Sequence, residues 1–525
     1  VLSQFNQCIA IRYFQRLCTY YTNSGMLNVL IKYRGLFVVL FVLPTSLIFK
    51  AYMSTRNRLV FWLNSAPDKH ADKIKKVQQQ VLAWQQKTGG KIPMCTARPG
   101  WQAMSHKQGN YKKTHYQVDV NLMDILDIDE KKGTVRLEPM ANMGQISALL
   151  KPLGWSLAVI PELDALTVGG LINGFGIESS SHKYGLFQSI CESLEIVTAD
   201  GELVKCSKEE NSELFYAIPW SYGSLGFLVC AEIKIIPSKD YVQLTYIPFK
   251  SKHAFIKRFT EESLKPTNEA YDFIEGIMYS EQEAVLMLGN FADKVPSRKT
   301  KNAINNFWKP WFYKYVHAIL KQDKEQEEWI PLRHYYHRHT RALFWEMALI
   351  IPFGNSPWFR YLLGWMSPPE VSLLKLTDAE AVHKLYDTHH MDQDLLLPLS
   401  NLDKTLSYLK QKVDFHPLWL CPMRVFDTPI RGMVNPQPNE QMFVDVGIYG
   451  EPNVENYNSK ETTRKLEALM RKMGGFQALY ADTFQTREEF REMFDHTLLD
   501  QLRVQTNATK AFPEPYDKVS RAART

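Results

Sequence analysis

The segment Gly35–Phe49 is predominantly apolar, with fifteen residues without a charge and with basic residues on both sides. A helix that spans a membrane needs about 20 apolar residues, so this run is short. Lys50 could reach the membrane surface with its ammonium group, which would extend the span to Met53. The pattern favours a single N-terminal membrane anchor at residues 32–54, after a leader at residues 1–31. A hairpin-like anchor and a buried core helix are alternatives, and the basic flanks leave the orientation open.

Periodic apolar positions predict the first elements after this run. Within Asp68–Thr88, apolar residues recur at steps of three and four, which makes one helical stripe that ends at Gly89. The stripe consists of Ile74, Val77, Val81 and Trp84. The same reasoning predicts strands at Val118–Leu122 and Thr134–Glu138 and a helix at Asn142–Leu150.

The second half of the chain alternates between strand and helix patterns without an internal repeat. A second domain is expected to begin near Asp240, after a strand that Pro237 ends. Strands and helices together predict a mixed α+β architecture. The predicted strands are Tyr241–Pro248, Ile277–Gly289, Leu418–Phe426 and Met442–Tyr449, and the predicted helices are His253–Leu264 and Lys460–Met473.

Glycines concentrate in the segment Thr167–Gly185, TVGGLINGFGIESSSHKYG. Glycine lets another molecule approach the peptide plane closely, and a run of free N–H groups can hold a diphosphate. A glycine-rich turn between strands is the simpler interpretation. The third glycine of a Rossmann fingerprint is missing, and no P-loop occurs. Asp200-Gly201, which follows, lies between two alternating runs and predicts a hairpin.

Composition narrows the class of protein. Hydrophobic residues make up 45% of the 525 residues and charged residues 22%, which is typical of globular proteins. The 62 basic and 56 acidic residues give a net charge of +6, too small to indicate a nucleic-acid partner. The seven cysteines are odd in number and contain no C-x-x-C pair, which argues against a disulfide framework or a zinc site and predicts no metal.

Several short sequence motifs resemble those of a known protein family. ARPGW (97–101), PELDALTVGG (161–170), TADG (198–201) and GSLGFL (223–228) occur in the order found in FAD-binding domains of the vanillyl-alcohol-oxidase type, also called the PCMH type. Longer blocks, IESSSHKYGLFQ, RHYYHRHTRALFWE and REEFREMFD, resemble the Delta(24)-sterol reductases. The resemblance runs from about Leu36 to the C-terminus.

The resemblance implies an α+β fold with a two-subdomain PCMH-type FAD-binding domain at residues 60–239 and a cap or substrate domain at residues 240–525. FAD is expected to bind without a covalent link, because Gln102 stands where some relatives of the superfamily carry a flavin-linked histidine. The residues that the resemblance assigns to FAD are Arg98, Gly100, Trp101, Thr167, Val168, Gly169, Gly170, Leu171, Ile172, Asn173, Gly174, Phe175, Gly176, Ile177, Glu178, Ser179, Gly223, Gly226 and Val229.

The implied activity is reduction of the C-24/C-25 double bond of a sterol, of the desmosterol-to-cholesterol type, with NADPH as the donor. An isolated alkene needs a proton as well as a hydride, and Tyr480 and His334 are the candidate proton donors. The alternatives are an FAD-dependent alcohol or lactone oxidase of the same superfamily and a scaffold without flavin. The implied location is the endoplasmic reticulum membrane with a cytosolic catalytic part, or the Golgi membrane. Homo-oligomers and complexes with other sterol-pathway enzymes are left open.

Three features have two interpretations each. Glu178 could touch a ribose hydroxyl or cap the glycine loop. The segment Arg333–Arg341 contains three histidines without a nearby carboxylate, so a metal site is disfavoured, and its arginines could instead meet a dinucleotide phosphate. The segment Ile351–Trp365 could pack in the core or form a second membrane-contacting surface. Its large apolar residues include Trp358, Phe359, Tyr361, Leu362, Leu363 and Trp365.

Overall fold

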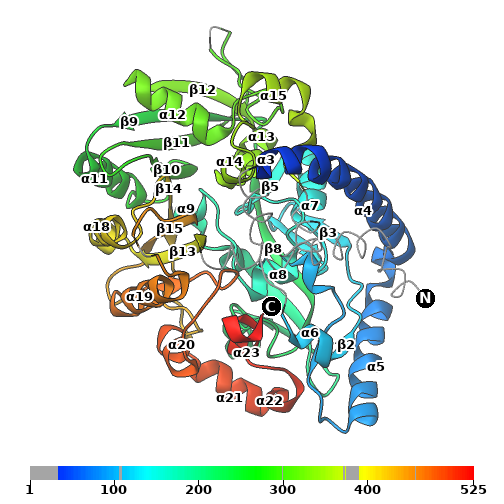
Figure 1. Ribbon diagram of the computed structural model, residues 1–525. Coiled ribbons are helices and arrows are strands. Elements are labelled where there is room, and N and C mark those ends of the chain that lie inside the picture. The colour runs from blue at the N-terminus through cyan, green and yellow to red at the C-terminus, as the bar shows by residue number, and fades with distance from the viewer. Residues whose placement is uncertain are drawn as a thin grey trace.

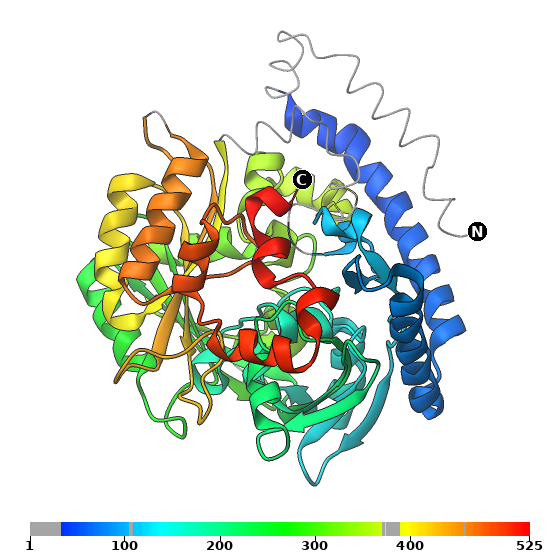
Figure 2. The same ribbon diagram turned by 90° about the horizontal axis from the view of Figure 1, so that it is seen from below.

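The computed structural model describes residues 33–103, 105, 109–297, 299–369, 373, 389–455 and 457–524. The predicted leader at residues 1–31 lies outside them. The described part begins with a continuous helical stretch along the outside of the molecule (Figures 1 and 2). It consists of α3 (Arg34–Phe37), η1 (Val38–Val42) and α4 (Leu43–Asn64).

This N-terminal helix is longer than the predicted anchor, because it continues to Asn64. Residues Gly35–Asn64 are long and apolar enough to cross a membrane, and only 11% of their most apolar window is buried. Leu43 and Ser46 are buried, and α4 packs against η7 (Gly364–Met366). The helix therefore touches the globular part along a narrow stripe and leaves most of its apolar surface uncovered.

The predicted amphipathic helix is confirmed as α5 (His70–Thr88), after η2 (Pro67–Lys69). Its four stripe residues are buried, and it ends at Gly89, whose φ of 59° places it in the left-handed region. Next to it, β1 (Met94–Thr96) pairs in parallel with β2 (Tyr116–Val118). The predicted strand Val118–Leu122 was wrong in position, because the ladder with β1 ends at Val118.

A six-stranded sheet forms the centre of the N-terminal half. Its order is β3-β4-β8-β6-β7, and β5 also pairs with β8. The hairpin at Asp200-Gly201 is confirmed, since Val197 pairs with Leu203 across it. The strands are β3 (Ile125–Asp129), β4 (Thr134–Leu137), β5 (Trp155–Leu157), β6 (Cys191–Val197), β7 (Leu203–Ser207) and β8 (Phe227–Pro237).

Short helices surround this sheet. The predicted helix at Asn142–Leu150 is confirmed as α7 (Met143–Leu150), which Asn142 and Gln145 cap reciprocally. The others are η3 (Gly100–Gln102), α6 (Tyr111–Thr114), η4 (Lys151–Leu153), α8 (Val168–Asn173), α9 (Ser181–Tyr184), η5 (Phe187–Ile190) and α10 (Ser212–Ala217).

The second half is built on an eight-stranded antiparallel sheet with the order β12-β9-β11-β10-β14-β15-β13-β16. The predicted single strand Ile277–Gly289 was wrong: it is a hairpin of two strands, turned at Tyr279–Glu283. The strands are β9 (Tyr241–Phe249), β10 (Phe273–Met278), β11 (Ala284–Ala292), β12 (Gln326–Pro331), β13 (Met391–Pro398), β14 (Leu418–Arg424), β15 (Met442–Gly450) and β16 (Phe476–Gln477).

The two faces of this sheet have different neighbours. Alternate side chains such as Ile274, Leu395 and Val444 pack under the outer helices α11 (Lys252–Ser263), α18 (Leu402–Lys412) and α19 (Ser459–Lys472) (Figure 1). Side chains of the other face, such as Trp419 and Phe443, join the core of the N-terminal half. Both faces are buried, so hydrophobic alternation along these strands is weak.

The middle segment and the C-terminus complete the fold. Near the C-terminus, Ala508, Ala511 and Phe512 are buried against the stripe of α5, so the chain returns to its N-terminal half (Figure 2). The domain limits 60–239 and 240–525 stay a prediction. The remaining elements are α12 (Phe312–Gln322), α13 (Leu332–Tyr336), η6 (Thr340–Ala342), α14 (Glu346–Ile350), α15 (Pro357–Leu362), η8 (Leu399–Asn401), α20 (Arg487–Met493), α21 (Thr497–Gln505), α22 (Ala508–Ala511), α23 (Pro515–Val519) and η9 (Arg521–Ala523).

Candidate active site

The glycine segment folds as the short helix α8 followed by a tightly packed loop. A side chain at Gly169 would place its Cβ 2.9 Å from Cβ of Pro139, and one at Gly174 would come within 2.8 Å of the Gly170 carbonyl oxygen. Both distances are closer than carbon atoms tolerate, so these positions require glycine. The backbone can approach its neighbours here only without side chains.

Hydrogen bonds bring two other predicted segments to this loop. Nη1 of Arg98 donates to Oγ1 of Thr167 at 3.0 Å and its Nη2 donates to the Gln102 carbonyl at 3.1 Å. On the other side, Oδ1 of Asn173 accepts from the backbone N–H of Gly223 at 3.1 Å. The first loop, the glycine loop and the GSLG segment, all assigned to FAD from the sequence, are therefore neighbours. Whether each residue touches FAD stays a prediction.

Two predicted residues lie at the edge of this assembly. The side chain of Val229 packs in a separate apolar cluster with Val81 and Phe512. The ring of Trp101 lies 6.4 Å from that of Phe49, edge to face, so the first loop contacts the N-terminal helix. The side chain of Val229 therefore lies outside the loop assembly, and its contact with FAD stays a prediction.

Basic side chains gather beside these loops. Nζ of Lys518 donates to the Tyr222 carbonyl at 2.7 Å, and Nζ of Lys112 donates to Oγ1 of Thr96 at 2.7 Å. Arg524 donates to the Leu479 and Ala481 carbonyls at 2.8 and 2.9 Å. Within the residues that the structure describes, Lys112, Lys518, Arg524 and Arg98 form no ion pair.

Electrostatics indicate that this cluster is built for an anion. Burial lowers the pKa of Lys518 to about 7 and that of Lys112 to about 8. Lys112 adds to the lowering at Lys518, and Asp517 opposes it only in part. Nε of Arg98 is buried without a hydrogen-bond partner among the described residues. A ligand with two negative charges, such as a diphosphate, would neutralise the cluster and use this free donor.

A buried ionic network joins the glycine loop to the large sheet. Nη2 of Arg338 donates to Oε1 of Glu178 at 2.8 Å, and Nε of Arg338 donates to Oε1 of Glu275 on β10 at 2.6 Å. The other Glu275 oxygen accepts from Nε1 of Trp419 at 2.9 Å and contacts Nε2 of His339 at 3.1 Å. Burial acts to raise the pKa of Glu275, but Arg338 and His339 hold it well below its ordinary value.

This network bears on two of the open interpretations. Oε1 of Glu178 accepts hydrogen bonds from the N–H and hydroxyl groups of Ser179, each at 2.7 Å, so the carboxylate caps the loop. Contact of Glu178 with FAD stays a prediction. Arg338 donates to two carboxylates and to the Tyr335 carbonyl, and Arg341 donates to the backbone oxygens of residues 307, 309 and 310. These internal partners argue against contact of the two arginines with a dinucleotide phosphate.

The two candidate proton donors lie in different surroundings. The Tyr480 hydroxyl donates to Oδ2 of Asp394 at 2.6 Å, and burial with the nearby Asp394 raises the pKa of Tyr480 well above its ordinary value. His334 lies on α13, and its Nδ1 accepts from the backbone N–H of Asn305 at 3.1 Å. Burial lowers the pKa of His334. The two residues share no hydrogen-bonded partner in the described structure.

Comparison with known proteins agrees with this site. Residues 77–207 match the family model described as "FAD binding domain". The Delta(24)-sterol reductases of Macaca fascicularis and Homo sapiens are each 52% identical over 502 residues, 95% of this chain and 96% of each relative. The Delta(24)-sterol reductase of Arabidopsis thaliana is 40% identical over 526 residues, 94% of this chain and 93% of the relative.

This chain belongs to the Delta(24)-sterol reductase family. The predicted family, the FAD-binding domain and the mixed α+β fold are thereby confirmed. Members of this family are oxidoreductases, so the enzyme class predicted from the sequence is confirmed as well.

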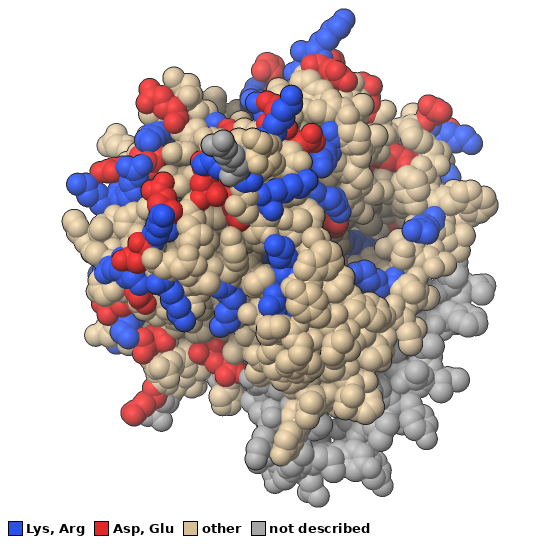
Figure 3. All heavy atoms as spheres, turned by 90° about the horizontal axis from the view of Figure 1, so that it is seen from above, with Lys and Arg blue, Asp and Glu red and all other residues tan. Residues whose placement is uncertain are grey.

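The aromatic segment of this Delta(24)-sterol reductase family member is exposed next to the N-terminal helix. Trp358 and Tyr361 of α15 are 53% and 65% exposed, and Leu362 and Trp365 are 67% and 54% exposed, whereas Phe359 is buried. The upper face carries most of its charged side chains on one side and a broad uncharged area on the other (Figure 3). Core packing thus accounts for Phe359 but not for the other four side chains.

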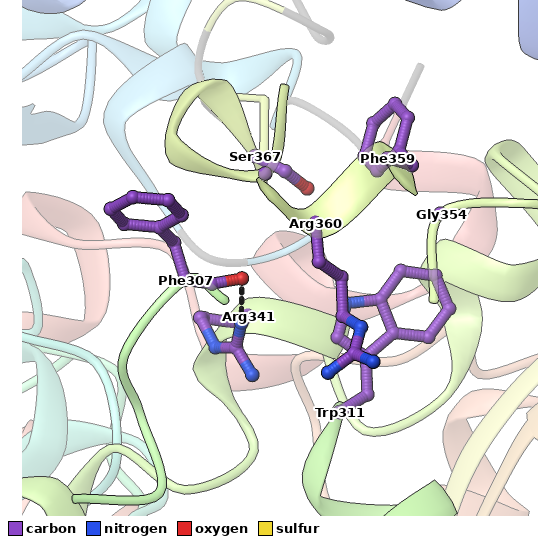
Figure 4. Close-up of a pocket in the computed structure, with 8 residues that line it drawn as sticks. Phe307, Trp311, Arg341, Gly354, Phe359, Arg360 and Ser367 are labelled. Carbon is purple, nitrogen blue, oxygen red and sulfur yellow. Dashed lines mark hydrogen bonds between the residues drawn. The ribbon is translucent and has the colours of Figure 1, made fainter. Parts of the chain in front are cut away.

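The α15 segment packs against the loop at residues 307–311. Phe307, Trp311, Arg341 and Arg360 surround a small hollow beside α15, and Nη1 of Arg341 donates to the Phe307 carbonyl at 2.8 Å (Figure 4). Nη1 of Arg360 donates to the Trp308 carbonyl at 2.8 Å. The Arg360 hydrogen bond joins α15 to the loop at residues 307–310, and Arg341 of η6 binds the same loop.

Sequence reasoning missed the acidic and basic residues that surround the site. Asp394 directly precedes the apolar run Leu395–Leu397 of β13, and Asp445 interrupts the apolar strand β15. The aspartate in β15 is itself a signal, since charged residues are rare on buried strands. Nothing in the sequence around Lys518 and Arg524 indicates a binding role. They reach the glycine loop only because the C-terminal segment folds back onto the N-terminal half.

Proposed function

We propose that this protein reduces the C-24/C-25 double bond of a sterol, with FAD as cofactor and NADPH as hydride source. The observation that carries the proposal is similarity to Delta(24)-sterol reductases over 95% of the chain. The assembly of three loops and an uncompensated cationic cluster supports it, because that donor set suits the diphosphate of FAD.

FAD, when bound, supplies hydride transfer, and the protein supplies position and exclusion of water. Arg98, Lys112, Lys518 and Arg524 would hold the diphosphate next to the glycine loop. The inward face of the large sheet contributes Trp419, Met423 and Phe443, all buried. Burying a methylene group contributes about 0.8 kcal/mol, so such a surface can hold a sterol side chain with few polar contacts.

A proton donor is required because an isolated alkene has no carbonyl group to polarise. We keep Tyr480 as the proposed donor, since its hydroxyl is buried beside the sheet and hydrogen-bonded to an acid. His334 has less support, because burial lowers its pKa and its Nδ1 accepts a hydrogen bond from the backbone N–H of Asn305. A general acid contributes about 100- to 10,000-fold in rate.

We further propose that the N-terminal helix anchors the protein in the endoplasmic reticulum membrane as a single pass, with the catalytic part in the cytosol. The long apolar helix supports the anchor, and the contact of Phe49 with Trp101 joins it to the predicted flavin loop. The exposed side chains of the α15 segment would meet the same membrane. A sterol could then pass from the bilayer to the site without crossing water.

The test of the activity is anaerobic and spectroscopic. The full chain is purified in detergent, loaded with FAD, mixed with NADPH and then with desmosterol, while the flavin absorbance is followed. Bleaching by NADPH and recovery on adding the sterol are expected. Bleaching without recovery would reject the sterol as substrate. Oxygen consumption with alcohol substrates, and no reaction with the sterol, would favour the oxidase alternative.

A further inference from the structure

Two buried aspartates lie on the face of the large sheet that meets the N-terminal half. Asp394 is on β13 and Asp445 on the neighbouring strand β15, where Asp445 pairs with Leu396. Because side chains alternate along a strand, Asp394 and Leu396 share a face, and the two aspartates are diagonal neighbours on it. Phe443 and Tyr449 of β15 belong to the same face and the same core.

The hydrogen bonds of the two carboxyl groups are unequal. Oδ1 of Asp394 lies 2.5 Å from the Tyr449 hydroxyl and its Oδ2 lies 2.6 Å from the Tyr480 hydroxyl. Asp445 is completely buried, and neither of its oxygens has a hydrogen-bond partner among the described residues. A carboxylate buried in this way is very costly, whereas a neutral acid is tolerated.

The charges around the pair favour the protonated form. Burial raises the pKa of Asp394 to about 7, with Asp392 of the same strand acting in the same direction, while hydrogen bonds from Tyr449 and Tyr480 act against it. Burial and the nearby Asp394 raise the pKa of Asp445 well above its ordinary value. Two neighbouring carboxyl groups cannot readily ionise together, so the pair retains at least one proton near neutral pH.

The pair adjoins the predicted flavin site on two sides. Arg524 of the cationic cluster donates to the backbone carbonyl of Tyr480 at 3.3 Å and to that of Leu479 at 2.8 Å. Asp445 pairs across the sheet with Cys421 on β14, the strand that also carries Trp419 of the ionic network. Tyr480 thus contacts Asp394 through its hydroxyl group and Arg524 of the cationic cluster through its backbone carbonyl.

We propose that Asp394, together with Asp445, is the proton reservoir that supplies C-24 of the sterol through the hydroxyl group of Tyr480. This proposal rests on the proposed function. Reduction adds one hydride to C-25 and one proton to C-24. When Oδ2 of Asp394 carries the proton, the hydrogen bond is reversed: the acid donates to the Tyr480 oxygen, and the tyrosine O–H is free to point at C-24. As the new C–H bond forms at C-24, the O–H bond of Tyr480 breaks and the Asp394 proton moves to the tyrosine oxygen. Asp394 is left ionised and regains a proton from Asp445 or from solvent.

Asp394 acts through Tyr480 and is therefore a positioning and proton-supplying residue. If the acid pair were purely structural, Asp394→Asn would keep the shape of the site and fold normally. The test therefore needs a measurement that changes only if Asp394 supplies a proton. The pH profile of the sterol step and the infrared signal of a protonated carboxyl group are such readouts. Glu467→Gln is a matched control, because Glu467 is also a buried acid with a pKa raised by burial to about 7, but it lies on α19 and accepts from Thr483 and Phe484.

The experiment separates the two half-reactions of the full, FAD-loaded chain. Flavin bleaching by NADPH is measured first, and recovery on adding desmosterol is measured at a series of pH values. In the wild type, recovery of the flavin absorbance is expected to slow as the pH rises above about 7, because Asp394 loses the proton that it would supply. Asp394→Asn should bleach normally, recover at least about 100-fold more slowly and lose this pH dependence. Asp394→Glu should restore part of the rate, and Glu467→Gln should behave as the wild type.

Each outcome decides the proposal. Infrared spectra should show a protonated carboxyl band near neutral pH that Asp394→Asn diminishes. Because other buried acids such as Glu467 contribute to this band, a band of equal intensity in the wild type and Asp394→Asn would overturn the proposal without any measurement of activity. Recovery of Asp394→Asn at the wild-type rate would overturn it while leaving the proposed function intact. If the wild type itself failed to recover with sterol, the proposed function would fall and the reservoir with it.

Discussion

Nη2 of Arg338 lies 2.8 Å from Oε1 of Glu178, and this ion pair joins the glycine loop to a segment 160 residues away. Both side chains are almost completely buried. The same guanidinium group binds Glu275 of the large sheet, so one cation holds two carboxylates from the two halves of the molecule. The position of the predicted flavin loop relative to the substrate side of the site depends on this contact.

Replacing Arg338 is therefore expected to be strongly destabilising. Arg338→Met leaves Glu178 and Glu275 buried without their cation, and removal of one partner from a buried pair typically costs about 3–5 kcal/mol. The free energy of unfolding from denaturant titration should fall by that amount.

Arg333→Met provides the control for that measurement. Arg333 pairs with Asp164 at 2.6 Å, but both side chains are nearly half exposed. Exposed pairs contribute about 0–1 kcal/mol, so this variant should remain close to the wild type. Equal losses of unfolding free energy in the two variants would show that burial does not determine how much the Arg338 ion pairs stabilise the fold.

A second prediction concerns the contribution of the cationic cluster to FAD binding. Lys518→Met removes a charged donor from the proposed diphosphate site, and hydrogen bonds to charged groups contribute about 1.5–3 kcal/mol. The dissociation constant of FAD, from its fluorescence, should rise about 10- to 100-fold. The FAD-free variant should not be less stable, because Lys518 is buried there without a counter-ion.

Lys510→Met is the matched control, since Lys510 lies close by on α22 with an exposed side chain. It should bind FAD as the wild type does. A wild-type affinity in Lys518→Met would place the diphosphate elsewhere and would remove the main structural support for the proposed cofactor site.

Local patterns allowed prediction of part of this site, and long-range packing explains the rest. The glycine loop could be predicted because its residues are contiguous in the sequence. Gly174 is required by a contact within that loop and Gly169 by a contact with Pro139. The role of Glu178 could not be predicted, because its ion-pair partner Arg338 lies 160 residues further along the chain. The hairpin within Ile277–Gly289 was missed because both of its strands are apolar on both faces.

Stability should depend on pH through Asp394. Its pKa is about 7 in the folded protein and about 3.9 in an unfolded chain, so between these values the folded state holds the extra proton. Stability therefore falls as the pH rises from about 4 through 7, in total by on the order of 4 kcal/mol for this group. Asp394→Asn should flatten that slope when unfolding free energies are measured across the range.

Asp403→Asn is the control for this pH series, because the Asp403 side chain is 65% exposed on the outer helix α18. Its slope should match that of the wild type. Other buried acids, including Asp445, contribute with the same sign, so the difference between wild type and Asp394→Asn is the quantity to compare. An unchanged slope in Asp394→Asn would mean that Asp394 is ionised in the folded protein.

The exposed aromatic segment should lie within reach of lipid. Trp and Tyr side chains favour the membrane interface, and four large side chains of this segment are exposed beside a helix that could span the bilayer. In nanodiscs with brominated lipids, the wild-type tryptophan fluorescence should be quenched, and Trp365→Phe should reduce the quenched fraction. Trp329→Phe is the control, because Trp329 is 4% exposed on β12 and should not contribute to quenching. Quenching that is equal in Trp365→Phe and the wild type would show that the N-terminal helix holds the enzyme without this second contact, and that sterol reaches the site by another route.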